Sequence, residues 1–408
     1  MLVAIVGLGY VGLPTAIAVA KSGFKVVGID INRERIRQLN NNQSFIAEIP
    51  NQEIKSISRR FFATTNWKEI KKCQIIIIAV PTPLTKHKTP DTSFIEAAAK
   101  KIAKYLQPNS LVILESTTYP GTTEELLKPL LPPCYLAFAP ERIDPGNKQF
   151  KFGEVPKVVG GIDRTSTDLA ASFYSHFIKK TYKVSSARAA EMTKLLENIF
   201  RLVNISMVNE LKMLSDRLNI DFWEVIEAAK TKPYGFMPFY PGPGCGGHCI
   251  PLDPFYLSWK ARELNFFTRF IDLAGEINEL MPHYVVTKII GALNRQGKPL
   301  NNSKVLILGV AYKKDIDDPR ESPALEIIKD LMGKKARVLY NDPRIPEIIV
   351  NGSVIKSILL TPQLIKEMDC VAIITDHSVY DYNLIAEKAK LIVDIRNATK
   401  KKLANIVK

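Results

Sequence analysis

Short, continuously apolar runs alternate with helix-like stretches in the first half of the chain. Such runs are expected for β-strands that helices cover on both faces, because every side chain is then buried. The runs lie at residues 2–6, 25–29, 75–80, 111–114 and 135–139. Their alternation with helices predicts an α/β fold built on a doubly wound parallel sheet.

From about residue 187 to 218 the pattern becomes that of one long helix. Its apolar residues recur at three- and four-residue spacing, as Met192, Leu195, Leu196, Ile199, Leu202 and Val203. A stretch dense in proline and glycine follows at 233–254, and further helix is expected from 255 to about 293. Long irregular segments inside compact proteins are usually functional, which makes 233–254 a candidate site.

The β/α alternation returns after a polar linker at 296–303, with strands expected at 304–308, 336–340, 370–375 and 391–395. A chain of 408 residues is long enough for two or three domains. We predict two Rossmann-like doubly wound parallel-sheet domains, at 1–186 and 299–408. A central region at 187–298, with the long helix, joins them.

The net charge of +15 raises the question of a nucleic-acid partner. Basic residues are spread along the chain in short runs only, and no nucleic-acid-binding motif accompanies them. The apolar N-terminal segment lacks the basic leading region of a signal peptide. We therefore expect neither a nucleic-acid nor a membrane partner, and interpret the basic surface as attractive to anionic metabolites.

The five cysteines are widely spaced and include no Cys-x-x-Cys pair: Cys73, Cys134, Cys245, Cys249 and Cys370. This spacing argues against a disulfide framework and against a zinc site. We predict a reducing, cytoplasmic location and no bound metal.

A glycine motif, Gly7-Leu8-Gly9-Tyr10-Val11-Gly12, follows the first predicted strand and opens a helix. In that context the backbone approaches a pyrophosphate closely, and the helix N-terminus receives its charge. Asp30 ends the second strand, where it can accept hydrogen bonds from ribose hydroxyls and would repel a 2′-phosphate. The combination predicts an NAD site rather than glycines that only permit tight packing. Gly309-Val310-Ala311-Tyr312 stands at the corresponding place of the second sheet, so we expect one dinucleotide site.

Two polar segments follow other strands at their carboxyl ends, where ligands bind in such sheets. They are Val80-Pro81-Thr82-Pro83 and Glu115-Ser116-Thr117-Thr118. By themselves, both are also compatible with ordinary loops.

Cys249 lies just before an expected helix that Asp253 caps and Pro254 begins. The helix N-terminus and a nearby cation would lower the pKa of the Cys249 thiol and supply a nucleophilic thiolate. A buried structural cysteine is the alternative. Cys245 and His248 lack further ligands at metal-binding spacing, and we interpret His248 as a residue that orients the loop.

Lys194 and Asn198 are four residues apart on the long helix, so their side chains leave the same face. An ammonium beside an amide suits a developing alkoxide. Taken singly, Lys194 would be a solvated surface lysine.

These residues together resemble the UDP-glucose/GDP-mannose dehydrogenase family over nearly the whole chain. Six segments carry the resemblance: 7–12, 115–117, 139–142, 191–198, 246–249 and 313–323. The resemblance implies an NAD-dependent enzyme that oxidises the primary alcohol of a nucleotide sugar twice, to a carboxylate. It also implies a homodimer formed through the long helix, and a C-terminal domain that binds the UDP end of the substrate.

By the same resemblance, Cys249 captures the aldehyde as a thiohemiacetal, and the second oxidation gives a thioester that water cleaves. Lys194 and Asn198 are implied to stabilise oxyanions, and Glu141 to act as base in thioester hydrolysis. Thr117 and Asp253 are implied to position the water or the transferred proton. The implied NAD contacts are Gly7, Gly9, Tyr10, Val11, Gly12, Asp30, Arg35, Thr82, Thr117 and Arg320. The implied substrate contacts are Glu141, Arg142, Lys194, Asn198, Phe239, Tyr240, Gly244, Tyr312, Lys313 and Arg396.

One departure from the family pattern bears on the sugar. The segment 142–146 carries Pro145, where UDP-glucose enzymes usually have a second glutamate. Together with 242–244 and 247–249, this resembles the branch that acts on 2-acetamido sugars, and 231–240 is most similar to UDP-N-acetylglucosamine 6-dehydrogenases. UDP-N-acetylmannosamine and UDP-glucose stay open as alternative substrates, because the placement of one hydroxyl depends on loop geometry.

Two other functions stay open from the residues alone. A β-hydroxyacid dehydrogenase shares the dinucleotide domain, the long helix and a Lys-x-x-x-Asn pair, but performs one oxidation without a thiol. A non-catalytic NAD-binding regulator would keep only the fold. The intact Lys194, Asn198, Cys249 and Asp253 argue against the regulator.

Overall fold

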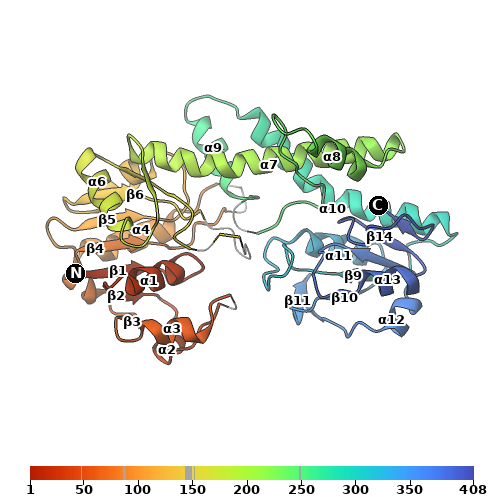
Figure 1. The fold of residues 1–408 in the computed structure, drawn as a ribbon, viewed down its shortest axis with the longest axis horizontal. Helices are drawn as coiled ribbons and strands as arrows, with labels where there is room; N and C mark the ends of the chain where they lie inside the picture. The colour runs from red at the N-terminus through yellow and green to blue at the C-terminus, as the bar shows by residue number, and fades with distance from the viewer. Residues whose placement is uncertain (47, 86–88, 143–148, 151, 248–249) are drawn as a thin grey trace. The chain divides into compact units, whose positions relative to one another are not determined.

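The computed structural model describes residues 1–46, 48–85, 89–142, 149–150, 152–247 and 250–408 (Figure 1). Contacts divide the chain into two compact units. The N-terminal unit comprises Met1–Asn198 and Phe255–Phe267, and the C-terminal unit comprises Ile199–Pro254 and Thr268–Lys408. Each unit contains one of the two predicted parallel sheets.

An eight-stranded sheet, in the order β3-β2-β1-β4-β5-β6-β7-β8, forms the centre of the N-terminal unit. The strands are β1 Leu2–Val6, β2 Lys25–Ile29, β3 Phe61–Thr64, β4 Ile75–Ile78, β5 Leu111–Leu114, β6 Tyr135–Phe138, β7 Lys157–Gly161 and β8 Thr181–Lys183. Neighbouring strands are parallel except β6 and β7, which pair antiparallel. The strand order reverses between β1 and β4, and sheets of this kind bind ligands at the carboxyl ends beside such a reversal.

Helices cover both faces of this sheet, which explains its continuously apolar strands. Val3 and Ile5 of β1 pack in one core cluster, whereas Ala4 and Val6 pack in the other. The first cluster lies under α1 (Gly12–Lys21), α3 (Asn51–Ile57) and α6 (Arg164–Tyr174). The second lies under the 3-10 helix η1 (Trp67–Lys72), α4 (Ser93–Ala103) and the π-helix η2 (Thr122–Leu127). The unit also contains two short helices, α2 (Arg33–Asn40) and α5 (Lys128–Leu130).

The predicted long helix is α7, Ala187–Arg217, with 31 residues. The helix expected from 255 to about 293 is two helices, α9 (Asp253–Arg262) and α10 (Arg269–Arg295), preceded by α8 (Phe222–Lys230). Helix α9 therefore begins at Asp253, the residue that we predicted as its cap. Within the part of the chain that the structure describes, no helix combines the length and apolar character needed to cross a bilayer.

A five-stranded parallel sheet, in the order β10-β9-β13-β14-β15, forms the centre of the C-terminal unit. Its strands are β9 Lys304–Leu308, β10 Arg337–Asn341, β13 Cys370–Ile373, β14 Ile392–Asp394 and β15 Ile406–Val407. Helices α10 and α11 (Pro323–Gly333) share one core cluster with this sheet, and α12 (Pro362–Glu367) and α13 (Tyr382–Lys388) share the other. An antiparallel hairpin joins β11 (Glu347–Val350) to β12 (Ser353–Lys356). This strand order, 2-1-3-4-5 along the main sheet, is one of the two common orders of doubly wound parallel sheets.

Six strands were not predicted from the sequence: β3, β7, β8, β11, β12 and β15. Most are short or partly exposed, so they lack the continuous apolar run on which the prediction rested. Strand β7 is different, because all five of its residues are buried. It begins with Lys157 and ends with Gly160 and Gly161, and neither lysine nor glycine is typical of strands.

Candidate active site

The glycine motif forms the tight turn between β1 and α1. A Cβ atom on Gly7 would lie 2.5 Å from the carbonyl oxygen of Ala79, and one on Gly12 would lie 1.8 Å from the carbonyl oxygen of Gly7. Nothing lies within 4 Å of the place where a Cβ of Gly9 would be. The turn thus requires Gly7 and Gly12 for packing, whereas Gly9 leaves open space beside the N-terminus of α1, as a dinucleotide pyrophosphate requires.

Asp30 is buried at the carboxyl end of β2, next to this turn. Its carboxylate accepts hydrogen bonds from the backbone N–H of Leu8 at 2.9 Å and of Asn32 at 2.8 Å. The guanidinium of Arg35 lies 3.7 Å away. The protein therefore holds an anionic group against the glycine turn, which fits the adenosine ribose of NAD. Tyr10, 43% exposed, lies in the same turn.

The two polar segments at the carboxyl ends of β4 and β5 are tied together. The Ser116 hydroxyl donates a hydrogen bond to the Val80 carbonyl oxygen at 2.7 Å. The Tyr256 hydroxyl donates another to the carbonyl oxygen of Thr82. Thr82 and Thr117, both half-buried, therefore lie on connected loops at the edge where the sheet order favours a ligand.

Lys194 and Asn198 leave the same face of α7, and both are buried, 7% and 5% exposed. The interpretation of Lys194 as a solvated surface lysine is therefore wrong. One turn earlier, Glu191 accepts hydrogen bonds from the Thr123 hydroxyl at 2.6 Å and from the backbone N–H groups of Gly121 at 2.6 Å and Thr123 at 2.9 Å. Burial raises the pKa of Glu191 to about 7 in spite of these donors.

Glu141 and Arg142 follow β6, and Arg142 ties their segment to α7. Its guanidinium forms a two-pronged ion pair with Glu197, through Nε at 3.2 Å and Nη2 at 2.6 Å, and donates to the Pro156 carbonyl oxygen at 2.6 Å. Glu197 precedes Asn198 on the helix. The structure therefore connects the segment that bears Glu141 to the turn of α7 that bears Asn198. Arg142, predicted as a substrate contact, is here engaged by the protein itself.

Sequence reasoning missed a buried lysine beside Glu141. The ammonium of Lys157 donates to Glu141 at 3.0 Å and to Glu115 at 2.9 Å, and its side chain is 3% exposed. No sequence signal distinguishes this lysine from other lysines that begin strands.

In the C-terminal unit, the glycine-rich segment packs against the loop after β9. A Cβ on Gly246 would lie 2.7 Å from the Cβ of Tyr312, and one on Gly247 would lie 2.8 Å from the Tyr312 ring. The Gly247 N–H donates to the Arg320 carbonyl oxygen at 3.2 Å. Gly244, with a φ of +114°, adopts a conformation that L side chains rarely take. Three predicted ligand contacts of this unit, Gly244, Tyr312 and Arg320, therefore belong to one cluster of loops.

Arg396 and the aromatic pair lie on other parts of the same unit. A Cβ on Gly242 would lie 2.6 Å from the Arg396 guanidinium, whose Nε donates to the Ile374 carbonyl oxygen at 2.8 Å. The Tyr240 hydroxyl donates to Glu227 at 2.8 Å. The ring of Phe239 packs against Phe200, with the ring centroids 5.7 Å apart.

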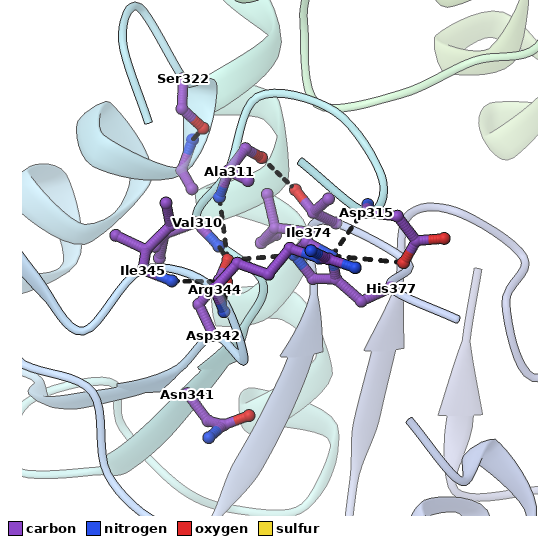
Figure 2. Close-up of polar contacts among 12 residues, drawn as sticks. Val310, Ala311, Asp315, Ser322, Asn341, Asp342, Arg344, Ile345, Ile374 and His377 are labelled. Atoms are coloured by element: carbon purple, nitrogen blue, oxygen red, sulfur yellow. Dashed lines mark hydrogen bonds and ion pairs between the residues drawn. The ribbon is translucent and has the colours of Figure 1, made fainter. Parts of the chain in front are cut away.

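A buried polar cluster fixes the loop that carries Tyr312 and Lys313 (Figure 2). Asp342 accepts hydrogen bonds from the backbone N–H of Val310 at 2.7 Å and of Ala311 at 3.0 Å. His377, fully buried, accepts the Asp315 N–H at its Nδ1, 3.0 Å away, and contacts Asp342 through Nε2, also at 3.0 Å. Because Nδ1 is an acceptor, the ring proton lies on Nε2 and is donated to Asp342.

The predicted nucleophile Cys249 and its neighbour His248 lie outside the described residues. Asp253, predicted to act with Cys249, is buried at the start of α9. Burial raises the pKa of Cys245 to about 11, against the lowering influence of Arg396 and Arg201, so Cys245 is a neutral thiol near pH 7. Among the described residues, the four cysteines form no disulfide, and no His, Cys, Asp or Glu cluster fit for a metal ion occurs.

The dinucleotide turn of the first sheet, together with a long helix that carries a buried lysine–asparagine pair, defines the class as an NAD-dependent dehydrogenase with a second doubly wound domain. The sequence also matches three protein-family models, which together cover most of the chain. The NAD binding domain of the UDP-glucose/GDP-mannose dehydrogenase family matches residues 1–178, its central domain matches 188–280, and its UDP binding domain matches 306–401. The chain belongs to this family, and it is an oxidoreductase that uses NAD and acts on a nucleotide sugar.

Individual relatives agree with the family. The chain is 37% identical to the UDP-N-acetyl-D-glucosamine 6-dehydrogenase of Pseudomonas aeruginosa over 351 residues, 84% of this chain and 82% of that protein. It is 35% identical to Protein CapL of Staphylococcus aureus over 409 residues, 97% and 95% of the two chains. The solved UDP-D-ManNAc dehydrogenase of Pyrococcus horikoshii superposes with a TM-score of 0.89 at 32% identity, covering 100% of this chain and 98% of that one.

Proposed function

We propose that this enzyme oxidises the C6 primary alcohol of UDP-N-acetylglucosamine twice, to UDP-N-acetylglucosaminuronate. The balanced reaction consumes the alcohol, two NAD⁺ and one water, and releases the carboxylate, two NADH and three protons. NAD supplies the hydride acceptor of both oxidations. The Pseudomonas aeruginosa relative and the 2-acetamido-like segments of the sequence support this choice of sugar.

The observation that carries the proposal is the buried lysine–asparagine pair of α7 and its link to Glu141. Lys194 and Asn198 place an ammonium and an amide where charge on an alkoxide can be stabilised without competition from bulk water. The ion pair between Arg142 and Glu197 holds the Glu141 segment against the same helix. A single oxidation would need no base for hydrolysis, whereas thioester cleavage does.

We propose these roles for the remaining predicted residues. Cys249 forms the thiohemiacetal and then the thioester, with Thr117 and Asp253 positioning the proton or the water. The residues of the glycine turn, with Asp30, Arg35, Thr82 and Arg320, hold NAD, and the C-terminal contacts hold the UDP-sugar. The three family matches support a division into domains at 1–186, 187–298 and 299–408.

UDP-N-acetylmannosamine is the second candidate substrate. The likeness to the Pyrococcus horikoshii UDP-D-ManNAc dehydrogenase, with its TM-score of 0.89, favours it. The two sugars differ in the configuration at one carbon, which a single loop contact can discriminate.

We also propose a homodimer formed through α7. Large apolar side chains recur three, four or seven residues apart along this helix, and each is at least 39% exposed: Met192, Leu196, Phe200, Met207, Leu211 and Leu214. Exposed large apolar side chains that recur along one helix mark an interaction surface. The wide spacing of the cysteines supports the cytoplasm as the compartment.

A panel of nucleotide sugars tests the proposal. The enzyme is incubated with excess NAD and limiting UDP-N-acetylglucosamine, UDP-N-acetylmannosamine or UDP-glucose, and NADH and acid are measured at completion. We expect two NADH per UDP-N-acetylglucosamine, loss of acid formation in Cys249→Ser, and normal yield in the control Cys134→Ser. A yield of one NADH per sugar, or full acid formation by Cys249→Ser, contradicts the proposal.

A further inference from the structure

Lys157 occupies an unusual position for a lysine, because its ammonium lies inside the N-terminal unit between two carboxylates. Glu115 is 1% exposed, and its two oxygens accept three hydrogen bonds: from Lys157 at 2.9 Å, from the Tyr174 hydroxyl at 2.7 Å and from the Thr15 hydroxyl at 3.1 Å. Glu141, the other partner of Lys157, is 14% exposed. One end of the network is therefore sealed, and the other reaches the surface at the predicted base.

The strand pairing explains how Lys157 comes to lie beside Glu141. Strand β7 runs antiparallel to β6, with Phe138 opposite Gly160. Continued three residues past Phe138 and three residues back from Gly160, this register sets Lys157 against Glu141. The first residue of β7 therefore lies at the carboxyl edge of the parallel sheet, where such folds bind their ligands.

Electrostatics fixes the charge of this lysine. Burial by itself lowers the pKa of Lys157, but Glu115 and Glu141 outweigh burial and raise it. The ammonium thus stays protonated across the physiological range. Glu141 shares this cation with Glu115 and also accepts the backbone N–H of Arg142 at 2.8 Å, so the protein holds its carboxylate in place through more than one donor.

Stability alone is a weak reason for such an arrangement. Replacing a buried ion pair by apolar groups of similar volume is often neutral or stabilising, because the desolvation of the charges is costly. An arrangement that holds one surface-reaching carboxylate in a fixed orientation serves the chemistry of that carboxylate instead.

We infer that Lys157 is a positioning residue for hydrolysis of the thioester, holding Glu141 ionised and oriented toward the attacking water. The inference rests on the proposed function. In the step, the water oxygen bonds to the acyl carbon while Glu141 takes a proton from the water. The bond between carbon and the Cys249 sulfur breaks, and the thiolate leaves with the electron pair. Glu141 returns its proton to solvent, and the new carboxylic acid releases the second proton of the water as it ionises. No oxidant or reductant takes part.

The test compares Lys157→Met with Lys183→Met, which removes an exposed lysine of the neighbouring strand β8 that pairs with Asp168 of α6. NADH is followed by stopped flow with UDP-N-acetylglucosamine or whichever sugar the panel selects, and acid-quenched enzyme is weighed by mass spectrometry. For Lys157→Met we expect a normal first burst of NADH, a 10- to 100-fold lower steady-state kcat, and enzyme carrying the covalent acyl group. Lys183→Met should match the wild type.

The pH profile of steady-state kcat separates positioning from mere structure. Loss of the cation moves the acidic limb of Lys157→Met to higher pH, and Lys157→Arg, which restores the charge, brings it back toward the wild type. In Glu115→Gln, Glu141 no longer shares the Lys157 cation with a second carboxylate, so the acidic limb of the kcat profile should move to lower pH. This variant tests the inference even if Lys157→Met fails to fold. An unmoved limb in both Lys157→Met and Glu115→Gln, or a lower kcat without accumulated acyl-enzyme, overturns the inference. A yield of one NADH per sugar by the wild type would instead overturn the proposed function.

Discussion

Gly9→Ala separates the binding role of the glycine turn from its folding role. No atom lies within 4 Å of the position of the new Cβ, so the protein itself tolerates the methyl group. The methyl would occupy the space that the NAD pyrophosphate needs, and it would push the phosphate away from the backbone N–H groups at the start of α1. A hydrogen bond to a charged group contributes about 1.5–3 kcal/mol, so the Kd for NAD should rise about 10- to 150-fold.

Fluorescence titration with NADH measures the affinity, and the thermal midpoint measures the fold. Gly9→Ala should keep the wild-type midpoint without cofactor and lose most of the shift that NAD produces. Gly12→Ala should lower the midpoint even without cofactor, because its Cβ would lie 1.8 Å from the Gly7 carbonyl oxygen and must displace the backbone. Gly291→Ala in α10 is the control, because no atom lies within 4 Å of the position of the new Cβ. It should leave the NAD affinity unchanged and should not lower the thermal midpoint. Unchanged NAD affinity in Gly9→Ala would refute this account of the turn.

Three further predictions follow from buried polar contacts. Burial raises the pKa of Glu191 in the folded protein from 4.5 to about 7, so its contribution to stability is full below pH 4.5 and is lost as the pH rises through 7. The thermal midpoint of the wild type should therefore fall between pH 5 and 8 more steeply than that of Glu191→Gln. Parallel curves for the two proteins would contradict this. His377→Ala removes buried hydrogen bonds that hold the loop of Lys313, which costs about 1–3 kcal/mol of stabilisation. The KM for the UDP-sugar should therefore rise about tenfold with little change in kcat. An unchanged KM would show that the loop does not depend on His377. Arg142→Met and Glu197→Gln should each lower kcat, and the double variant should be no slower than the slower of the two single variants. The two substitutions would then be coupled by about 1 kcal/mol. Additive losses in kcat would show that the pair does not act as a unit.

The sequence was sufficient for the two parallel sheets and the long helix, because strands covered on both faces and an amphipathic helix leave strong patterns. It was not sufficient for the turn after β9. Gly309 has a φ of +80°, and its Cβ would lie 2.4 Å from the Thr375 carbonyl oxygen, so this turn needs glycine much as Gly7 does. Asp342 directly follows β10 as Asp30 directly follows β2, and its carboxylate binds not only the backbone of Val310 and Ala311 but also the buried ring of His377. Such commitments depend on contacts between distant residues, and no local motif records them.

Lys157 is a second residue whose environment could not be predicted from the local sequence. Three strands begin with lysine followed by apolar residues: Lys25 in β2, Lys157 in β7 and Lys304 in β9. Lys25 and Lys304 are exposed, because parallel strands start at the edge of the sheet opposite the ligands. Strand β7 alone of the three runs the other way against its neighbour, so its first residue lies at the carboxyl edge beside Glu141. The same residue type in the same local pattern is therefore a solvated charge in two strands and an internal cation in the third, and strand direction decides between them. If Lys157 had no role in the reaction, Lys157→Met would remove the cost of burying a charge and leave the rate of hydrolysis unchanged. If Lys157 positions the base Glu141, the same substitution must slow hydrolysis.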